Sequence, residues 1–145
     1  MHSRVLRHHF GALIFLLLPL LFYVPAKAAV FTVTSSANGT SVDGVSLRWA
    51  LSQAAALPGF DQITFNIPGP APHIISLSSA LPSSTEFYQI DGESQPANGY
   101  TGTSQKVIVD GGNTVSNFLS SVSNSLIVEG VWMRNFTSHA IQGTA

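Results

Sequence analysis

The segment Ser46–Ile67 reads SLRWALSQAAALPGFDQITFNI and carries the signals of one short helix, one chain break and one strand. Four apolar residues share one face at helical spacing: Leu47, Ala50, Leu51 and Ala54. The hydroxyl of Ser46 is suited to accept a hydrogen bond from a free amide of the first turn, which makes this serine the expected N-cap. A helix is therefore predicted directly after Ser46.

The remainder of the chain is predicted to form short strands separated by turns. Pro58-Gly59 ends the helix, because proline cannot continue it and glycine accepts the left-handed turn. Alternating apolar and polar residues then predict a strand over Ile63–Ile67. Comparable segments are Val30–Ser35, Ile74–Leu77, Tyr88–Gly92, Lys106–Gly112, Asn117–Val122, Ser125–Gly130, Val131–Asn135 and Ala140–Gly143.

A short motif recurs at equal intervals of nineteen residues: Ile90-Asp91-Gly92, Val109-Asp110-Gly111 and Val128-Glu129-Gly130. A β-sandwich would join such strands by tight antiparallel hairpins, whereas a parallel β-helix stacks like residues from coil to coil. The interval is too long for hairpins and close to one turn of a three-sided coil. It favours an all-β fold, a right-handed parallel β-helix (solenoid), whose hand follows the general crossover rule.

The single helix has a place in such a solenoid. The first coil leaves an open edge and an apolar end, and terminal repeats need a cap. The helix after Ser46 is expected to be this short N-terminal capping α-helix. The chain stops at Ala145 after about three coils without a second cap, which predicts a solenoid truncated at its C-terminus and an N-terminal fragment of a longer protein.

The first 28 residues have the three parts of a secretory signal peptide. Arg4 and Arg7 make the n-region basic, Phe10 to Val24 is apolar, and Ala26-Lys27-Ala28 offers a small-x-small cleavage pattern. The apolar run is shorter than the ~20 residues that span a bilayer. We therefore expect residues 1–28 to be a signal peptide and residues 29–145 to be the secreted or cell-surface domain, with no membrane span after cleavage.

Composition excludes several classes of function. Residues 29–145 keep three of the six basic residues and all seven acidic ones, so their formal charge is −4, which argues against nucleic acid as a partner. The chain has no cysteine, so disulfides, thiolate metal sites and cysteine nucleophiles are excluded. Only 9% of residues are charged, a composition common in secreted β-proteins.

Four segments resemble the N-terminal region of secreted bacterial right-handed parallel β-helix proteins of the pectin-lyase-like superfamily, including the group named for the CSLREA motif. They are VSLRWA from Val45, PGFDQITF from Pro58, IDGESQP from Ile90 and VIVDG from Val107. Val45 stands where that motif has cysteine, and Trp49 where it has the glutamate that would close a capping box. The resemblance implies a large surface protein without a demonstrated reaction, although some relatives cleave polysaccharides.

Asp91 and Asp110 are the candidate site residues. If they stacked on successive coils, their backbones would lie ~5 Å apart, and the two carboxylates could bind Ca²⁺ or act as acid and nucleophile on a glycoside. The alternative is that each fixes its own turn by accepting from a backbone amide, with glycine supplying the turn conformation. The alternative is favoured, so neither a catalytic residue nor a cofactor is assigned, and Ca²⁺ is kept as the one candidate ion.

Four further polar residues and four aromatic residues are weaker candidates for a site. Asp61 is expected to organise the corner after the helix, and Glu129 to lie at a solvated corner. His73 and His139 lack metal-ligand spacing. The residues able to stack on sugars are Tyr88, Tyr100, Trp49 and Trp132. Trp132 points either outward as a sugar platform or inward, and a place in the core or in inter-coil stacking is favoured.

Two functions follow from these patterns. The favoured one is a non-catalytic secreted or cell-surface module, a stalk or adhesin, with polysaccharide or cell-surface glycans as partners. The other is the N-terminal part of a polysaccharide lyase or glycoside hydrolase whose active site lies on later coils.

Overall fold

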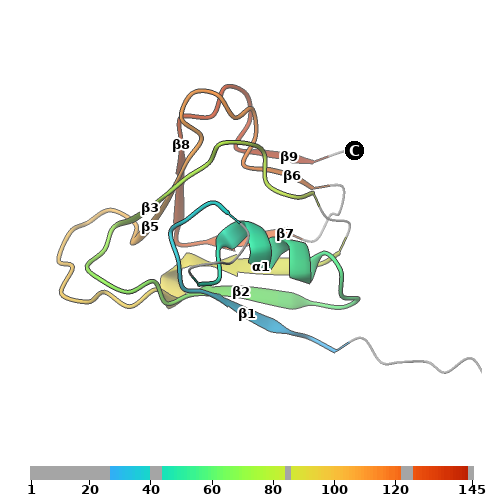
Figure 1. Ribbon diagram of the computed structural model, residues 1–145, viewed down its shortest axis with the longest axis horizontal. Coiled ribbons are helices and arrows are strands. Elements are labelled where there is room, and N and C mark those ends of the chain that lie inside the picture. Colours follow the sequence, from blue (N-terminus) through green and yellow to red (C-terminus); the bar gives the residue numbers. More distant parts are fainter. Residues whose placement is uncertain (1–26, 40–43, 84–85, 122–125, 144–145) are drawn as a thin grey trace, which may run out of the picture.

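The computed structural model describes residues 27–39, 44–83, 86–121 and 126–143 (Figure 1). The elements in chain order are β1 (Val30–Val33), α1 (Leu47–Ala54), β2 (Asp61–Phe65), β3 (His73–Ser76), β4 (Tyr88–Asp91), the 3₁₀ turn η1 (Gly92–Ser94), β5 (Val107–Asp110), β6 (Leu119–Ser121), β7 (Leu126–Glu129), β8 (Val131–Arg134) and β9 (Ile141–Gly143). Each predicted strand overlaps one of these strands, and the predicted helix is present. The predicted signal peptide lies outside the described residues except for Lys27 and Ala28.

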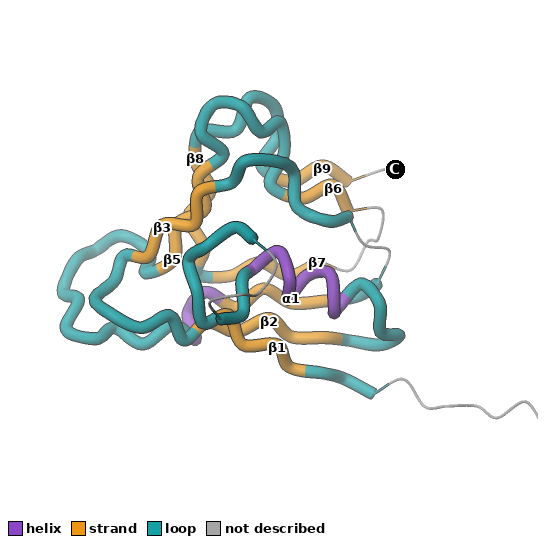
Figure 2. Tube along the Cα trace, viewed as in Figure 1, coloured by secondary structure: helices purple, strands orange, loops and turns teal. Residues whose placement is uncertain are grey.

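The strands form three separate sheets, which Figure 2 shows along the chain trace. Their orders are β1-β2-β4-β7, β3-β5-β8 and β6-β9. Every strand pair among the described residues is parallel. The β-sandwich alternative required antiparallel hairpins, and it is therefore excluded for this part of the chain.

The predicted right-handed parallel β-helix is wrong as well, because the three sheets do not close into a solenoid. They contain four, three and two strands, so successive stretches of chain do not each contribute the same set of strands. Between β1 and β2 the chain contributes α1 and no strand to the second sheet. Paired residues are 32 apart between β1 and β2, 27 apart between β2 and β4, and 24 apart between β5 and β8. The described strands are therefore not separated by a constant number of residues, as the coils of a regular solenoid would be.

The nineteen-residue interval has a different origin. Ile90-Asp91-Gly92 ends β4 in the four-stranded sheet, whereas Val109-Asp110-Gly111 ends β5 in the three-stranded sheet. The first and third copies do stack, because Ile90 pairs with Val128 and Asp91 with Glu129. Nineteen residues thus separate strands of different sheets. Two such steps, from Ile90 to Val128, bring the chain back to the same sheet.

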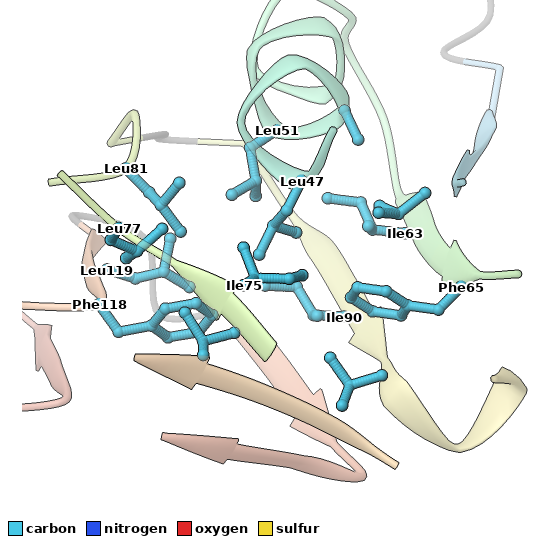
Figure 3. Packing of buried hydrophobic residues seen from close by; sticks show 14 of the residues in the cluster. Leu47, Leu51, Ile63, Phe65, Ile75, Leu77, Leu81, Ile90, Phe118 and Leu119 are labelled. Atoms are coloured by element: carbon cyan, nitrogen blue, oxygen red, sulfur yellow. The ribbon is translucent and has the colours of Figure 1, made fainter. Parts of the chain in front are cut away.

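Helix α1 has the N-cap and the buried face that its sequence predicts. The Ser46 hydroxyl accepts from the Trp49 amide at 3.1 Å, and the four residues at helical spacing are all buried. Leu47 and Leu51 point from α1 toward Ile63, Ile75 and Ile90 (Figure 3). Arg48, on the opposite side, donates to the Ser79 and Ala80 carbonyls at 2.8 and 2.7 Å, which ties the helix to the loop after β3. The helix thus closes the core on one side.

Alternation along the strands separates an inner face from an outer face. The inward residues join one apolar cluster, which contains Ile63, Phe65, Ile75, Ile90, Val107 and Val109. The residues between them point away from this cluster and form the outer faces of the sheets. These outer faces hold the candidate functional side chains.

Candidate functional site

The outer face of the β3-β5-β8 sheet combines an apolar row with a polar row. Parallel register aligns Ile74, Ile108 and Trp132 in the first row. Ile74 and Trp132 are exposed, at 44% and 47%, whereas Ile108 is covered although it is not part of the core cluster. Because period-two alternation puts neighbours on opposite faces, Val131 and Met133 turn inward and Trp132 turns out.

This placement contradicts the expectation that Trp132 belongs to the core. The side chains of Val131 and Met133 pack against the apolar cluster. Tryptophan is a large hydrophobic ring, and an exposed one on a flat sheet is a candidate platform for a ligand with an apolar face. Sugar rings, which present C–H groups on one face and hydroxyls at the rim, are ligands of this kind.

The second row of the same face is Ser76, Asp110 and Arg134. Asp110 accepts hydrogen bonds from the Gly112 amide at 2.9 Å, from Asn135 Nδ2 at 3.0 Å and from Arg134 Nε at 2.8 Å. These donors stabilise the charged form, the Gly112 amide most of all, and hold the pKa of Asp110 below its ordinary value. Asn135 reaches Asp110 from a left-handed backbone conformation (φ 56°), as expected of an asparagine at a corner.

The network holds Arg134 through one of its three guanidinium nitrogen atoms. Its Nε is bound to Asp110, and within the described part of the chain neither Nη atom has a hydrogen-bond partner. The side chain is 36% exposed and lies on the same side of β8 as Trp132. A planar guanidinium offers its remaining donors in a fixed direction, so Trp132 and Arg134 together present an apolar surface beside hydrogen-bond donors.

A second outer face lies on the four-stranded sheet. Its rows are Val30, Gln62, Gln89 and Ile127, followed by Thr32, Thr64, Asp91 and Glu129. Gln89 Nε2 donates to Glu129 Oε1 at 2.6 Å, and the hydroxyls of Thr32 and Thr64 lie 3.0 Å apart. The polar side chains of this face thus bind one another from strand to strand, which stabilises the sheet.

The structure separates the two candidate carboxylates. Asp91 aligns with Thr64 and Glu129, whereas Asp110 aligns with Ser76 and Arg134 in another sheet. Asp91 Oδ1 accepts from the Glu93 and Ser94 amides at 3.0 and 3.1 Å and thereby caps η1. Each aspartate therefore fixes its own turn, as the favoured interpretation held, and the two do not form a stacked pair.

No set of three or more metal-ligating side chains comes together among the residues that the structure describes. Binding of Ca²⁺ by Asp91 or Asp110 stays a prediction. His73 is buried in β3, and the exposed His139 lies within hydrogen-bond distance of Ser138, Nδ1 to Oγ, at 3.0 Å. Glu129, predicted to lie at a solvated corner, ends β7 and accepts from Gln89.

The other aromatic candidates are engaged within the fold. Tyr88 is 1% exposed, and burial raises its pKa to about 12. Trp49 packs edge-on against Phe31 with ring centroids 6.2 Å apart. The Tyr100 hydroxyl is hydrogen-bonded to Ser104 within its own loop. Trp132 is the aromatic ring of this group that the fold leaves most available.

Asp61 was expected to organise the corner after the helix, and this expectation is wrong. It is the first residue of β2, and its carboxylate turns inward to accept from the Ala29 amide at 2.8 Å. The contact joins residues 32 apart in the chain, and local turn signals do not reveal it.

None of the helices in the described ranges has the length and hydropathy to cross a bilayer. Comparison with models of protein families, with curated proteins and with solved structures gave no match, so the resemblance to the pectin-lyase-like superfamily stays a prediction.

Proposed function

We propose that the chain belongs to a non-catalytic secreted or cell-surface module that contacts polysaccharide or cell-surface glycans through the outer face of β3-β5-β8. One observation carries the proposal: Trp132 lies 47% exposed on the same side of β8 as Arg134. A sugar ring stacked on the indole would place its rim hydroxyls, or a uronate carboxylate, toward the Arg134 donors.

The hydrogen bonds of the Asp91 and Asp110 carboxylates support a binding role over a catalytic one. A general acid or nucleophile needs an oxygen aimed at the substrate. Asp110 accepts from three donors of its own corner, and Asp91 accepts from the first amides of η1. Both carboxylates therefore stabilise their own turns. Secretion is supported by the basic, apolar and small-x-small parts of residues 1–28.

The proposal is tested by binding of the full chain to soluble polysaccharides, both neutral and uronate-rich, in affinity electrophoresis and calorimetry. Trp132→Ala is expected to weaken binding about tenfold or more, because central aromatic residues dominate such contacts. The matched control is Ile127→Ala, which removes a 40% exposed side chain from the outer face of the other sheet.

Two outcomes would contradict the proposal. One is binding that Trp132→Ala leaves unchanged or that Ile127→Ala weakens equally. The other is turnover of a uronate polymer by the same preparation, which would favour the lyase or hydrolase alternative. Turnover that survives Asp91→Ala and Asp110→Ala would place the reacting groups elsewhere than on these two aspartates.

A further inference from the structure

The carboxylate of Asp61 is fully buried and incompletely paired. Its exposed fraction is 0%, and Oδ2 has no hydrogen-bond partner among the residues that the structure describes. Oδ1 accepts from one donor, the main-chain amide of Ala29, at 2.8 Å. A buried carboxylate normally has a cation or several donors, because desolvating it without them is costly. Asp61 therefore lacks positive charge and at least one donor.

The neighbours of Asp61 in the sheet do not supply this charge. At the start of the strands the register aligns Asp61, Tyr88 and Leu126 across the inner face, and the Ala29 amide donates to Asp61. The titratable side chains of this row are Asp61 and Tyr88. Burial keeps the Tyr88 phenol neutral by raising its pKa to about 12, and its hydroxyl has no hydrogen-bond partner in the described part of the chain. Within the described ranges the ion pair is Arg134 with Asp110, in the other sheet.

The partner of Asp61 is the residue at which the predicted mature chain begins. The small-x-small pattern Ala26-Lys27-Ala28 places cleavage between Ala28 and Ala29. Ala29 is also the first residue held by the sheet, because its carbonyl accepts from the Gln62 amide at 2.8 Å. Lys27 and Ala28, just before it, are exposed. The cleavage pattern and the hydrogen bond of Asp61 are independent observations, and both involve the main-chain nitrogen of Ala29.

We propose that cleavage after Ala28 converts the Ala29 amide into an α-ammonium group that forms a buried ion pair with Asp61. Hydrolysis of the Ala28–Ala29 bond adds water, leaving a carboxylate on Ala28 and a protonated amine on Ala29. The amide had one N–H, whereas the ammonium has three, so it can donate to Oδ2 as well as to Oδ1. The same step supplies the missing positive charge.

The consequence is that removal of the leader completes β1. Before cleavage, Asp61 is a buried carboxylate with one neutral donor from the segment that leads into the edge strand β1. After cleavage, a charge-assisted pair joins Ala29, the residue just before β1, to Asp61, the first residue of β2. The inference depends on processing at Ala28 and not on what the module binds.

The experiment uses the full chain, exported with its own leader from a bacterial host. Intact-mass analysis of the exported protein is expected to give Ala29 as the first residue. The pKa of its α-amine is then measured by trace acetylation across pH, with Lys106, the other amine after cleavage, as internal reference. A free α-amine titrates at about 8. Pairing with Asp61 is expected to raise this pKa by one unit or more, and Asp61→Asn to return it to about 8.

Glu86 provides the matched control, because it is the carboxylate that precedes Tyr88 by two residues. Glu86→Gln is expected to leave the α-amine pKa unchanged. If Asp61→Asn is not exported, the wild-type value alone decides, since an unpaired amine would titrate at about 8. A first residue other than Ala29, an unshifted wild-type pKa, or a shift that follows Glu86 instead of Asp61 would each overturn the proposal.

Discussion

The side-chain amide of Gln95 makes both main-chain hydrogen bonds of Ile67. Gln95 Oε1 accepts from the Ile67 amide at 2.8 Å, and Gln95 Nε2 donates to the Ile67 carbonyl at 2.9 Å. Gln95 is 0% exposed and Ile67 is 3% exposed. The glutamine thus acts as a neighbouring strand for Ile67, two residues beyond the end of β2.

Replacing Gln95 by leucine is expected to be strongly destabilising, because it leaves a buried amide and a buried carbonyl unpaired. At about 1–3 kcal/mol for each of the two orphaned groups, the loss is roughly 2–6 kcal/mol. Urea unfolding followed by circular dichroism measures it. Gln53→Ala on α1 is the control and should change stability by less than ~0.5 kcal/mol. A loss for Gln95→Leu no larger than that of the control would contradict this account.

Gly92 and Gly130 touch where the first and third copies of the motif stack. A Cβ on Gly92 would lie 2.3 Å from the Gly130 carbonyl oxygen, and Gly130 itself has φ +62°. Gly92→Ala is therefore expected to cost about 1–3 kcal/mol through forced displacement of main chain. Gly39→Ala, where a Cβ has nothing within 4 Å, is the matched control and should be tolerated. Equal melting temperatures for the two variants would refute the packing argument.

Local signals in the sequence predicted the elements, but not their assembly. Alternation and turn residues located the strands because those signals act within a few residues. Sheet membership depends on how far apart in the chain the paired residues lie, and separations of 32, 27 and 24 residues hide the pairing from a search for equal repeats.

The candidate surface was missed for a related reason. In β8, Val131, Trp132 and Met133 are all apolar, so period two predicts alternation without saying which set is buried. The core takes Val131 and Met133, and Trp132 is left outside. The contact of Asp61 with Ala29 likewise depends on sheet register, which a single sequence does not reveal.

Trp49 stands where a glutamate would complete the capping box of α1, so Trp49→Glu exchanges one interaction for another. The glutamate could bind the Ser46 amide, but the edge-on contact with Phe31, at an interplanar angle of 80°, would be lost. Loss of the ring contact and its buried area outweighs the cap, and we expect a net loss of roughly 1 kcal/mol. A double-mutant cycle with Phe31→Leu tests this, because Trp49→Glu should cost less in the Phe31→Leu background. A higher urea midpoint for Trp49→Glu alone would contradict the prediction.

His73 makes the stability of the fold sensitive to mild acid. It is 8% exposed, Nε2 has no hydrogen-bond partner within the described ranges, and burial lowers its pKa below 6.5. As pH falls through 6.5, the unfolded chain binds this proton before the folded chain does, so stability present above pH 6.5 is progressively lost below it. His73→Leu, which keeps an apolar group in the inner row, should flatten the dependence of the unfolding free energy on pH between about 7 and 5. His139→Gln, which changes an exposed histidine, is the control. Urea titrations at a series of pH values measure both, and a slope that His73→Leu does not reduce would assign the acid sensitivity to another group.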